Sequence, residues 1–148
     1  MVTYLEVAPD ALIDGIAAEL KNKPQIKAPV WTIFVKTSAN KEQPPANSDW
    51  WHIRAAAILR KVAVYGPLGT NKLKVMYGGK QRRGHKKPVF VTGSGNIARK
   101  CLQQLEAAGL VKHEIVGTHK GRSITPAGVK LLDSIAYKIA KATPAQKQ

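Results

Sequence analysis

The sequence predicts a mainly α-helical domain that contains one small β-hairpin. Four segments repeat apolar residues at the three- and four-residue spacing of amphipathic helices. A segment near the C-terminal end alternates apolar and polar residues around a glycine-containing turn, which is typical of a hairpin. The 148 residues also fit one domain that can bury its own core. We therefore expect a single domain over 1–148, with flexible ends at 1–8 and 142–148.

Two of the predicted helices lie in the first half of the chain. Residues 9–21 repeat apolar side chains at helical spacing, and Pro9 suits a first helical turn. The apolar run at 27–38 fits either a strand or a buried irregular segment, so the path of residues 22–47 stays open. The second helix is expected to begin at Trp50 and to end at Gly66 and the following proline.

The second half predicts a short helix in the stretch TNKLKVMYGG, a glycine-rich loop at 77–88 and a brief strand at 89–91. A long helix follows, with Ser94 as its N-cap and Gly109 at its C-terminal end. Segments 110–116 and 122–125 form the expected hairpin. The last helix begins at Pro126, with Thr125 as its cap.

Charge is distributed very unevenly along the chain. The 24 Lys and Arg residues outnumber the 9 Asp and Glu residues, which gives a net charge of +15. The segment 50–105 holds 12 of these cations and no carboxylate, so it offers them no ion-pair partner of its own. An isolated basic run is usually a solvated face. Over so long a span, the absence of acids favours a polyanionic partner, namely nucleic acid.

The candidate RNA-binding cations lie on the second helix, the short helix, the 77–88 loop and the start of the long helix: Arg54, Arg60, Lys61, Lys72, Lys80, Arg82, Arg83, Lys86, Lys87, Arg99 and Lys100. Gly78, Gly79 and Gly84 would let the loop turn and approach a phosphate chain closely. Trp50 and Tyr77 flank these cations and could stack on bases or arginines, or could close the core.

Nothing in the sequence indicates an enzyme or a cofactor. A GxGxxA match begins at Gly93, but too few residues follow it to complete a dinucleotide-binding sheet. No Ser, His and Asp set suggests a hydrolase. The four histidines are scattered without partners at metal-ligand spacing, so no metal site is expected. Cys101 falls on an apolar helix face and is interpreted as a buried, inert thiol.

The order of elements predicts a winged-helix-like domain with an extra N-terminal helix. A helix ending in LEAAGLV, a two-stranded wing and a helix starting at SITPAG follow one another as in that fold. Both DNA regulators and RNA-binding proteins use it. In a dimeric transcription regulator the long helix would enter the major groove and read bases through Arg99, Lys100, Gln103 and Gln104. That alternative remains open at this point.

Four strings occur in order along the chain: DWWHIRAAAILRKV, YGGKQRRG, SGNIARKCLQQLEAAGLV and GRSITPAG. Together they resemble the archaeal and eukaryotic small-ribosomal-subunit protein family of the S-nineteen-e type. The resemblance implies a structural protein that binds rRNA in the head of the small subunit, next to other head proteins, and supports subunit maturation. It also implies that Arg54, Arg60, Arg83 and Arg99 face the RNA.

The expected setting is the cytoplasmic ribosome. The single cysteine cannot form an internal disulfide, and no secretory leader is evident. No apolar stretch approaches the roughly 20 residues that a membrane-spanning helix needs. Outside the ribosome we expect a monomer.

Overall fold

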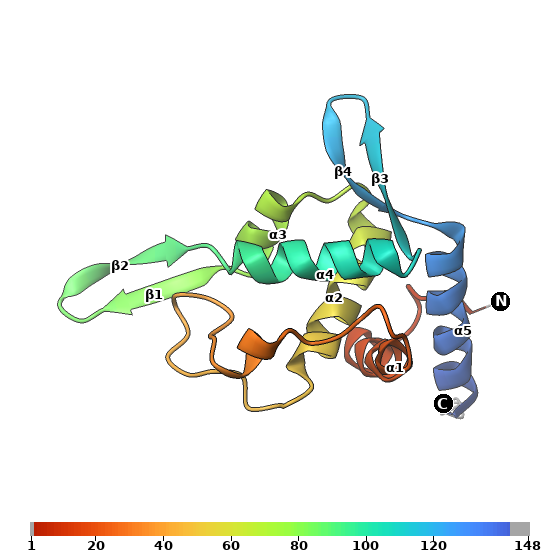
Figure 1. Cartoon of the computed structure of the whole chain (residues 1–148), viewed down its shortest axis with the longest axis horizontal. Helices are drawn as coiled ribbons and strands as arrows, with labels where there is room; N and C mark the ends of the chain where they lie inside the picture. The colour runs from red at the N-terminus through yellow and green to blue at the C-terminus, as the bar shows by residue number, and fades with distance from the viewer. Residues whose placement is uncertain (1, 143–148) are drawn as a thin grey trace, which may run out of the picture.

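Five α-helices and two β-hairpins make up residues 2–142, the part of the chain that the computed structural model describes (Figure 1). The elements are α1 (Pro9–Lys21), the 3₁₀ helix η1 (Val30–Ile33), α2 (Trp50–Tyr65), α3 (Thr70–Met76), β1 (Gly79–Arg83), β2 (Lys86–Val91), α4 (Gly95–Ala107), β3 (Val111–Val116), β4 (His119–Ile124) and α5 (Pro126–Ala142). None of these helices is long and apolar enough to cross a membrane.

The predicted helix ends are confirmed by their capping bonds. Ser94 Oγ accepts a hydrogen bond from the backbone N–H of Ile97, and Thr125 Oγ1 accepts one from the N–H of Gly128 at 3.2 Å. Gly109, just after α4, has a φ of +72°, the left-handed conformation that glycine adopts most easily. These local signals fix where α4 and α5 begin and how α4 ends.

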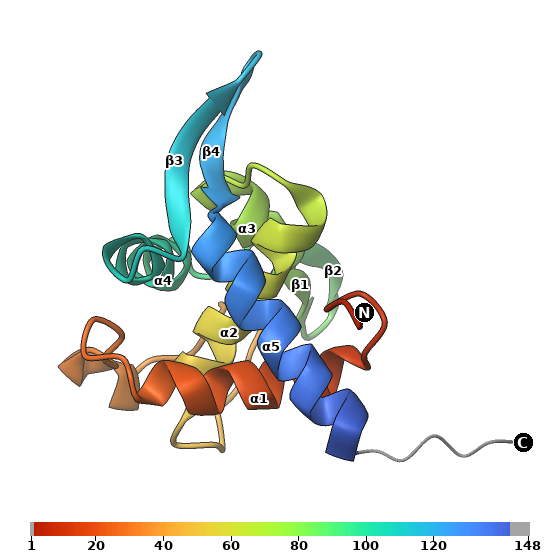
Figure 2. The ribbon, with the colours of Figure 1, turned by 90° about the vertical axis from the view of Figure 1, so that its right-hand side faces the viewer.

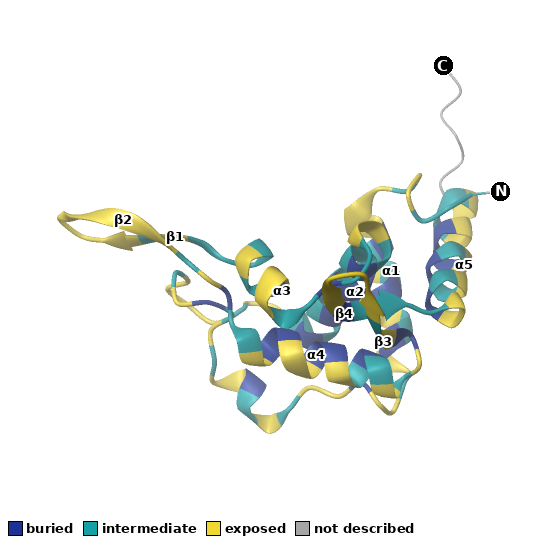
Figure 3. Cartoon of the chain, turned by 90° about the horizontal axis from the view of Figure 1, so that it is seen from above, coloured by how far each residue is buried: buried dark blue, intermediate teal, exposed yellow. Residues whose placement is uncertain are grey.

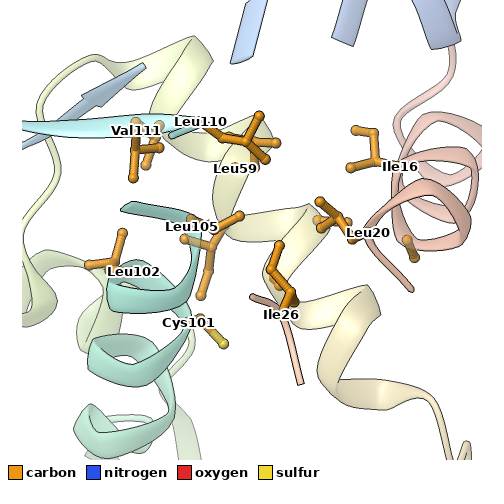
Figure 4. Packing of buried hydrophobic residues seen from close by; sticks show 14 of the residues in the cluster. Ile16, Leu20, Ile26, Leu59, Cys101, Leu102, Leu105, Leu110 and Val111 are labelled. Carbon is orange, nitrogen blue, oxygen red and sulfur yellow. The ribbon is translucent and has the colours of Figure 1, made fainter. Parts of the chain in front are cut away.

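One hydrophobic cluster holds the helices together, with α2 at its centre. Leu20 of α1, Leu59 of α2 and Leu105 of α4 are all fully buried in it (Figure 4). Burying one such side chain stabilises a fold by about 1.5–3 kcal/mol relative to leaving it exposed. Helix α5 crosses α1 and packs against it (Figure 2).

The arrangement of α2, α3, α4 and the β3–β4 wing confirms the winged-helix-like fold, with α1 as the extra N-terminal helix. A third strand of the wing sheet is reduced to one residue. Leu68, between α2 and α3, exchanges two backbone hydrogen bonds with Arg122 of β4, at 3.0 and 3.1 Å. The neighbouring Gly121 makes this approach possible, because a Cβ there would lie 2.8 Å from the carbonyl carbon of Leu68.

The stretch 77–88 is a second hairpin, so the prediction of a loop was wrong. Strands β1 and β2 pair antiparallel, with Lys80 opposite Phe90 and a bulge between Gln81 and Arg83. Gly84, with a φ of +67°, forms the turn, and β2 includes the strand expected at 89–91. Most of the hairpin is exposed on both faces (Figure 3). Without a buried face, its sequence has no apolar alternation to reveal it.

The path of residues 22–47 is now defined. Its apolar run forms η1 and is largely not buried: Val30, Ile33 and Phe34 are 85%, 71% and 76% exposed. The chain then reaches the base of the β1–β2 hairpin, where the N–H of Ser94 donates to the carbonyl oxygen of Thr37 at 3.0 Å. A loop covering 36–47 therefore lies beside the hairpin before α2 begins.

The N-terminal segment 2–8 is attached to the domain. Val2, Tyr4 and Val7 pack partly buried against the core. The backbone N–H of Tyr4 donates to a carboxylate oxygen of Asp133 on α5 at 3.1 Å. Of the end expected to be flexible, 142–148, residue 142 is the last of α5, and residues 143–148 lie outside the described part of the chain.

Candidate nucleic-acid interface

Among residues 2–142, the cations of the acid-free segment form no ion pair with a carboxylate. Four ion pairs occur in residues 2–142: Lys21 with Asp49, Lys112 with Glu114, Arg122 with Glu106, and Lys138 with Glu19. None of them includes a residue between 50 and 105. Among residues 2–142, this part of the protein therefore keeps its cations free of ion pairs and able to attract a polyanion.

The β1–β2 hairpin carries the densest group of these cations: Lys80, Arg82, Arg83, Lys86 and Lys87, all exposed. Arg83 also stabilises the turn, because its Nε and Nη2 donate to the carbonyl oxygen of Lys87 at 3.0 and 2.7 Å. The hairpin stands at one end of the molecule's long axis, and α5 stands at the other (Figure 1). Its charge is therefore presented well away from the core.

Two of the three glycines assigned to this region have a different role from the one predicted. Gly78 and Gly79 do not have positive φ, and both sit in tight packing. A Cβ on Gly78 would lie 2.5 Å from the carbonyl oxygen of Val91, and one on Gly79 would meet the side chain of Asn40. These two residues let the base of the hairpin pack closely against the rest of the domain. Only Gly84 serves the turn, as expected.

Tyr77 joins the hairpin to the second helix through its aromatic ring. The guanidinium carbon of Arg54 lies 4.0 Å from the ring centroid, and Lys61 Nζ lies 5.4 Å from it. Burial raises the pKa of Tyr77 to about 12, although the charge on Arg54 opposes that shift. The tyrosine thus stacks on an arginine of this protein, one of the alternatives that the sequence left open. Arg54 is accordingly half-buried and held in place.

The remaining predicted cations are dispersed over the helices. Arg60 is half-buried on α2, and its Nε has no hydrogen-bond partner in the described part of the protein. Lys72 is exposed on α3. Arg99 and Lys100 are exposed in the first half of α4, which starts at the base of the hairpin. The helix faces therefore extend the charge beyond the hairpin.

Lys36 and Lys41 add two cations beside the hairpin that the sequence does not predict there. They line a cleft of about 240 Å³ together with Lys80 and Arg82 of β1, and we call these four residues the cationic cleft. Both lysines lie outside the acid-free segment, in a part of the chain whose acids slightly outnumber its cations. The fold brings them to the hairpin through the contact between 37–38 and 93–94. No local pattern in the sequence indicates that contact.

In the alternative interpretation, α4 would read DNA bases, but one of its four base-reading side chains already forms hydrogen bonds within the protein. Gln104 Oε1 accepts a hydrogen bond from the indole N–H of Trp51 at 2.9 Å, and its Nε2 donates to the carbonyl oxygen of Lys27 at 2.7 Å. The side chain thus fastens the segment after α1 to α4. One of the four proposed base-reading residues is therefore committed to the fold, which argues against groove recognition by this face.

Residues 2–142 hold neither an exposed thiol nor a group of side chains that could bind a metal ion. Cys101 is buried as predicted, and burial raises the pKa of its thiol to about 12. Such a thiol is almost entirely protonated at neutral pH and a poor nucleophile. No three His, Cys, Asp or Glu side chains within residues 2–142 gather in a way that could hold a metal ion.

A winged-helix-like domain with a cationic hairpin, whose basic segment forms no ion pair among residues 2–142, fits the class of nucleic-acid-binding proteins. The sequence matches the ribosomal protein S19e family over residues 3–142. The chain belongs to that family, and it is therefore a structural ribosomal protein and not an enzyme.

Curated relatives support the same assignment over nearly their whole length. The small ribosomal subunit protein eS19 of Aeropyrum pernix is 48% identical over 141 residues, which cover 94% of this chain and 90% of the relative. The protein of the same name from Thermoplasma volcanium is 43% identical, with 95% and 91% covered. That of Haloarcula marismortui is 42% identical, with 92% and 90% covered.

Proposed function

We propose that the chain is a structural protein of the cytoplasmic small ribosomal subunit, where it binds rRNA in the subunit head and supports maturation of that subunit. The observation that carries this proposal is the cationic hairpin, with Lys36 and Lys41 added beside it. Side chains without internal partners can neutralise RNA phosphates and release counterions. The family and the names of the relatives supply the ribosomal context.

The hairpin suits folded RNA better than a regular duplex groove. The deep major groove of A-form RNA excludes most side chains, so proteins recognise its shape, phosphates and unpaired nucleotides. A narrow arm that carries cations on both faces can lie between two RNA segments and neutralise both. The cations on α2 and α4 then extend the contact from the hairpin to the body of the domain.

A charge reversal on the hairpin tests ribosomal binding. Lys80→Glu combined with Arg82→Glu changes two exposed residues, so the fold should survive, as judged by circular dichroism. We expect the variant to shift from small subunits to the free fraction of a sucrose gradient. The matched control is Lys130→Glu with Lys141→Glu, the same change on exposed residues of α5 at the other end of the molecule. It should remain with small subunits.

Equal co-sedimentation of both variants with the wild type would contradict the proposed interface. Cells that depend on the hairpin variant should also accumulate incompletely processed small-subunit rRNA. Normal rRNA processing in cells whose small subunits lack the protein would contradict the proposed role in maturation. Photo-crosslinks from position 82 should fall in head rRNA; crosslinks confined to other regions would contradict the head location.

Neighbouring proteins of the head are the proposed second class of partner. Val30, Ile33 and Phe34 of the η1 segment expose apolar surface to water, and such patches commonly mark protein contacts. A photo-crosslinking residue placed at position 34 should yield an adduct with another small-subunit protein. An adduct with rRNA alone would contradict this contact. Outside the ribosome, the protein should sediment as a monomer.

A further inference from the structure

A cavity of about 740 Å³ lies between α1, the 36–47 loop and α2. We call it the α1–α2 pocket. Pro44, Pro45, Trp50, Ile53 and Ala57 give it apolar walls. Asp10, Asp14, Arg54 and Tyr77 add polar groups to the same lining. Apolar walls with a few convergent polar groups are characteristic of a site for a small planar ligand or group.

The charge of the pocket distinguishes it from the surface around it. Asp10 and Asp14 form no ion pair or side-chain hydrogen bond within residues 2–142. Their two negative charges offset those of Lys41 and Arg54 in the same lining, so the pocket offers a phosphate no net attraction. A carboxylate is a hydrogen-bond acceptor only, so these groups select a ligand that presents N–H donors. On an RNA, the edges of unpaired bases present such donors.

The opposite wall is suited to stacking. One face of the Arg54 guanidinium lies over the Tyr77 ring, at 4.0 Å from its centroid, and the pair lines the pocket. Planar guanidinium groups and aromatic rings are the surfaces on which proteins stack unpaired bases. The Tyr77 hydroxyl is buried and has no hydrogen-bond partner among the described residues.

The pocket also adjoins the place where we expect the RNA backbone. Lys41 lines both the α1–α2 pocket and the cationic cleft, so the two share a wall in the 36–47 loop. A phosphate held in the cleft would leave its own or a neighbouring base next to the pocket. The cleft has four cations and the carboxylate of Glu42, whereas the pocket has two cations and two carboxylates, so a nucleotide between them would place its phosphate in the cleft and its base in the pocket.

We propose that the α1–α2 pocket binds a single unpaired base of the RNA, with guanine as the preferred base. Guanine presents its N1–H and its exocyclic amino group side by side, and one carboxylate can accept from both. The base would stack against the Arg54 side and direct its donor edge toward Asp10 and Asp14. This inference rests on the proposed RNA-binding function and adds a nucleotide-specific contact to it.

Two RNA hairpins that differ only by one bulged guanosine test the proposal with the full chain. We expect the wild type to bind the bulged RNA about tenfold more tightly than the uninterrupted one in a fluorescence anisotropy titration. Replacing the bulged guanosine with inosine, which lacks the amino group, should lose about fivefold. This arm leaves the protein unchanged, so its outcome is independent of folding.

Asp14→Asn supplies the sharper test on the protein side. The affinity for the bulged RNA should rise if Asp14 only repels phosphates, and should fall if Asp14 accepts hydrogen bonds from the base. Removing a carboxylate from a phosphate-binding surface strengthens RNA binding. If Asp14 accepts from the base, the variant should lose most of the tenfold preference while the uninterrupted RNA binds at least as well. The control is Glu42→Gln, which removes the same charge from the neighbouring cleft. It should strengthen binding to both RNAs and keep the preference.

The outcomes separate this inference from the proposed function. Salt-sensitive binding of both RNAs with equal affinity would overturn the pocket and leave the phosphate interface standing. Asp14→Asn that strengthens binding to the bulged RNA as much as Glu42→Gln does would also overturn it. No measurable binding to either RNA would overturn both.

Discussion

Removing hairpin cations should flatten the salt dependence of RNA binding. The perturbation is Lys80→Ala combined with Arg82→Ala, because both side chains are exposed and line the cationic cleft. Each neutralised phosphate contributes about 0.9 to the slope of log K against log salt for a duplex and about 0.7 for a single strand. With about six phosphate contacts, the wild type should show a slope of about −4 to −5. Loss of two contacts should make it shallower by about 1.4–1.8.

Anisotropy titrations of one labelled rRNA fragment at four KCl concentrations give these slopes directly. Lys130→Ala with Lys141→Ala removes the same charge from the α5 end of the molecule, and it should change the slope by much less. The reasoning would be refuted by a hairpin variant that binds more weakly at every salt concentration with the wild-type slope. Such a result would mean that the two side chains do not contact phosphates.

Three further predictions concern the fold that supports this surface. Gly121→Ala should lower the free energy of unfolding by about 2 kcal/mol in urea, since its Cβ would collide with the Leu68 backbone and disturb two hydrogen bonds; an unchanged midpoint would contradict this packing. Gln104→Ala should cost about 1–3 kcal/mol in the same assay, because the buried Trp51 indole N–H loses its acceptor. The Cys101 thiol should resist iodoacetamide at pH 8 until the protein unfolds, and fast alkylation of the native state would contradict its burial. Because burial raises its pKa from 9.0 to about 12, the unfolded thiol ionises first, so this contribution to stability is complete below pH 9 and is lost as the pH rises toward 12.

The helices could be predicted because their determinants are local. For α1 the predicted and observed bounds are the same, Pro9–Lys21, since a proline start and an apolar stripe lie within the segment itself. The caps of α4 and α5 are equally local, as Ser94 and Thr125 act on backbone groups three residues away. The wing was predicted for a similar reason, because its strands follow each other directly.

The features that the sequence did not reveal depend on distant contacts or on exposure. The β1–β2 hairpin has no buried face, so its strands lack the apolar alternation that identifies the wing. Lys36 and Lys41 reach the β1–β2 hairpin only because segment 37–38 contacts 93–94, far along the chain. The packing of Arg54 on Tyr77 likewise joins α2 to the end of α3. The charge pattern therefore identified the basic segment, but it could not predict which distant residues lie next to that segment in the fold.

The seating of the β1–β2 hairpin has a thermodynamic consequence for RNA binding. Fixing the backbone of a free loop upon binding costs about 1–2 kcal/mol of conformational entropy per residue, which would consume much of the attraction to RNA. Here cross-strand hydrogen bonds and the tight packing of Gly78 and Gly93 order the arm while the protein folds. That entropy is lost before the RNA arrives, so the phosphate contacts retain more of their free energy for binding. The β1–β2 hairpin is thus preorganised for binding, and most of the conformational adjustment falls to the RNA.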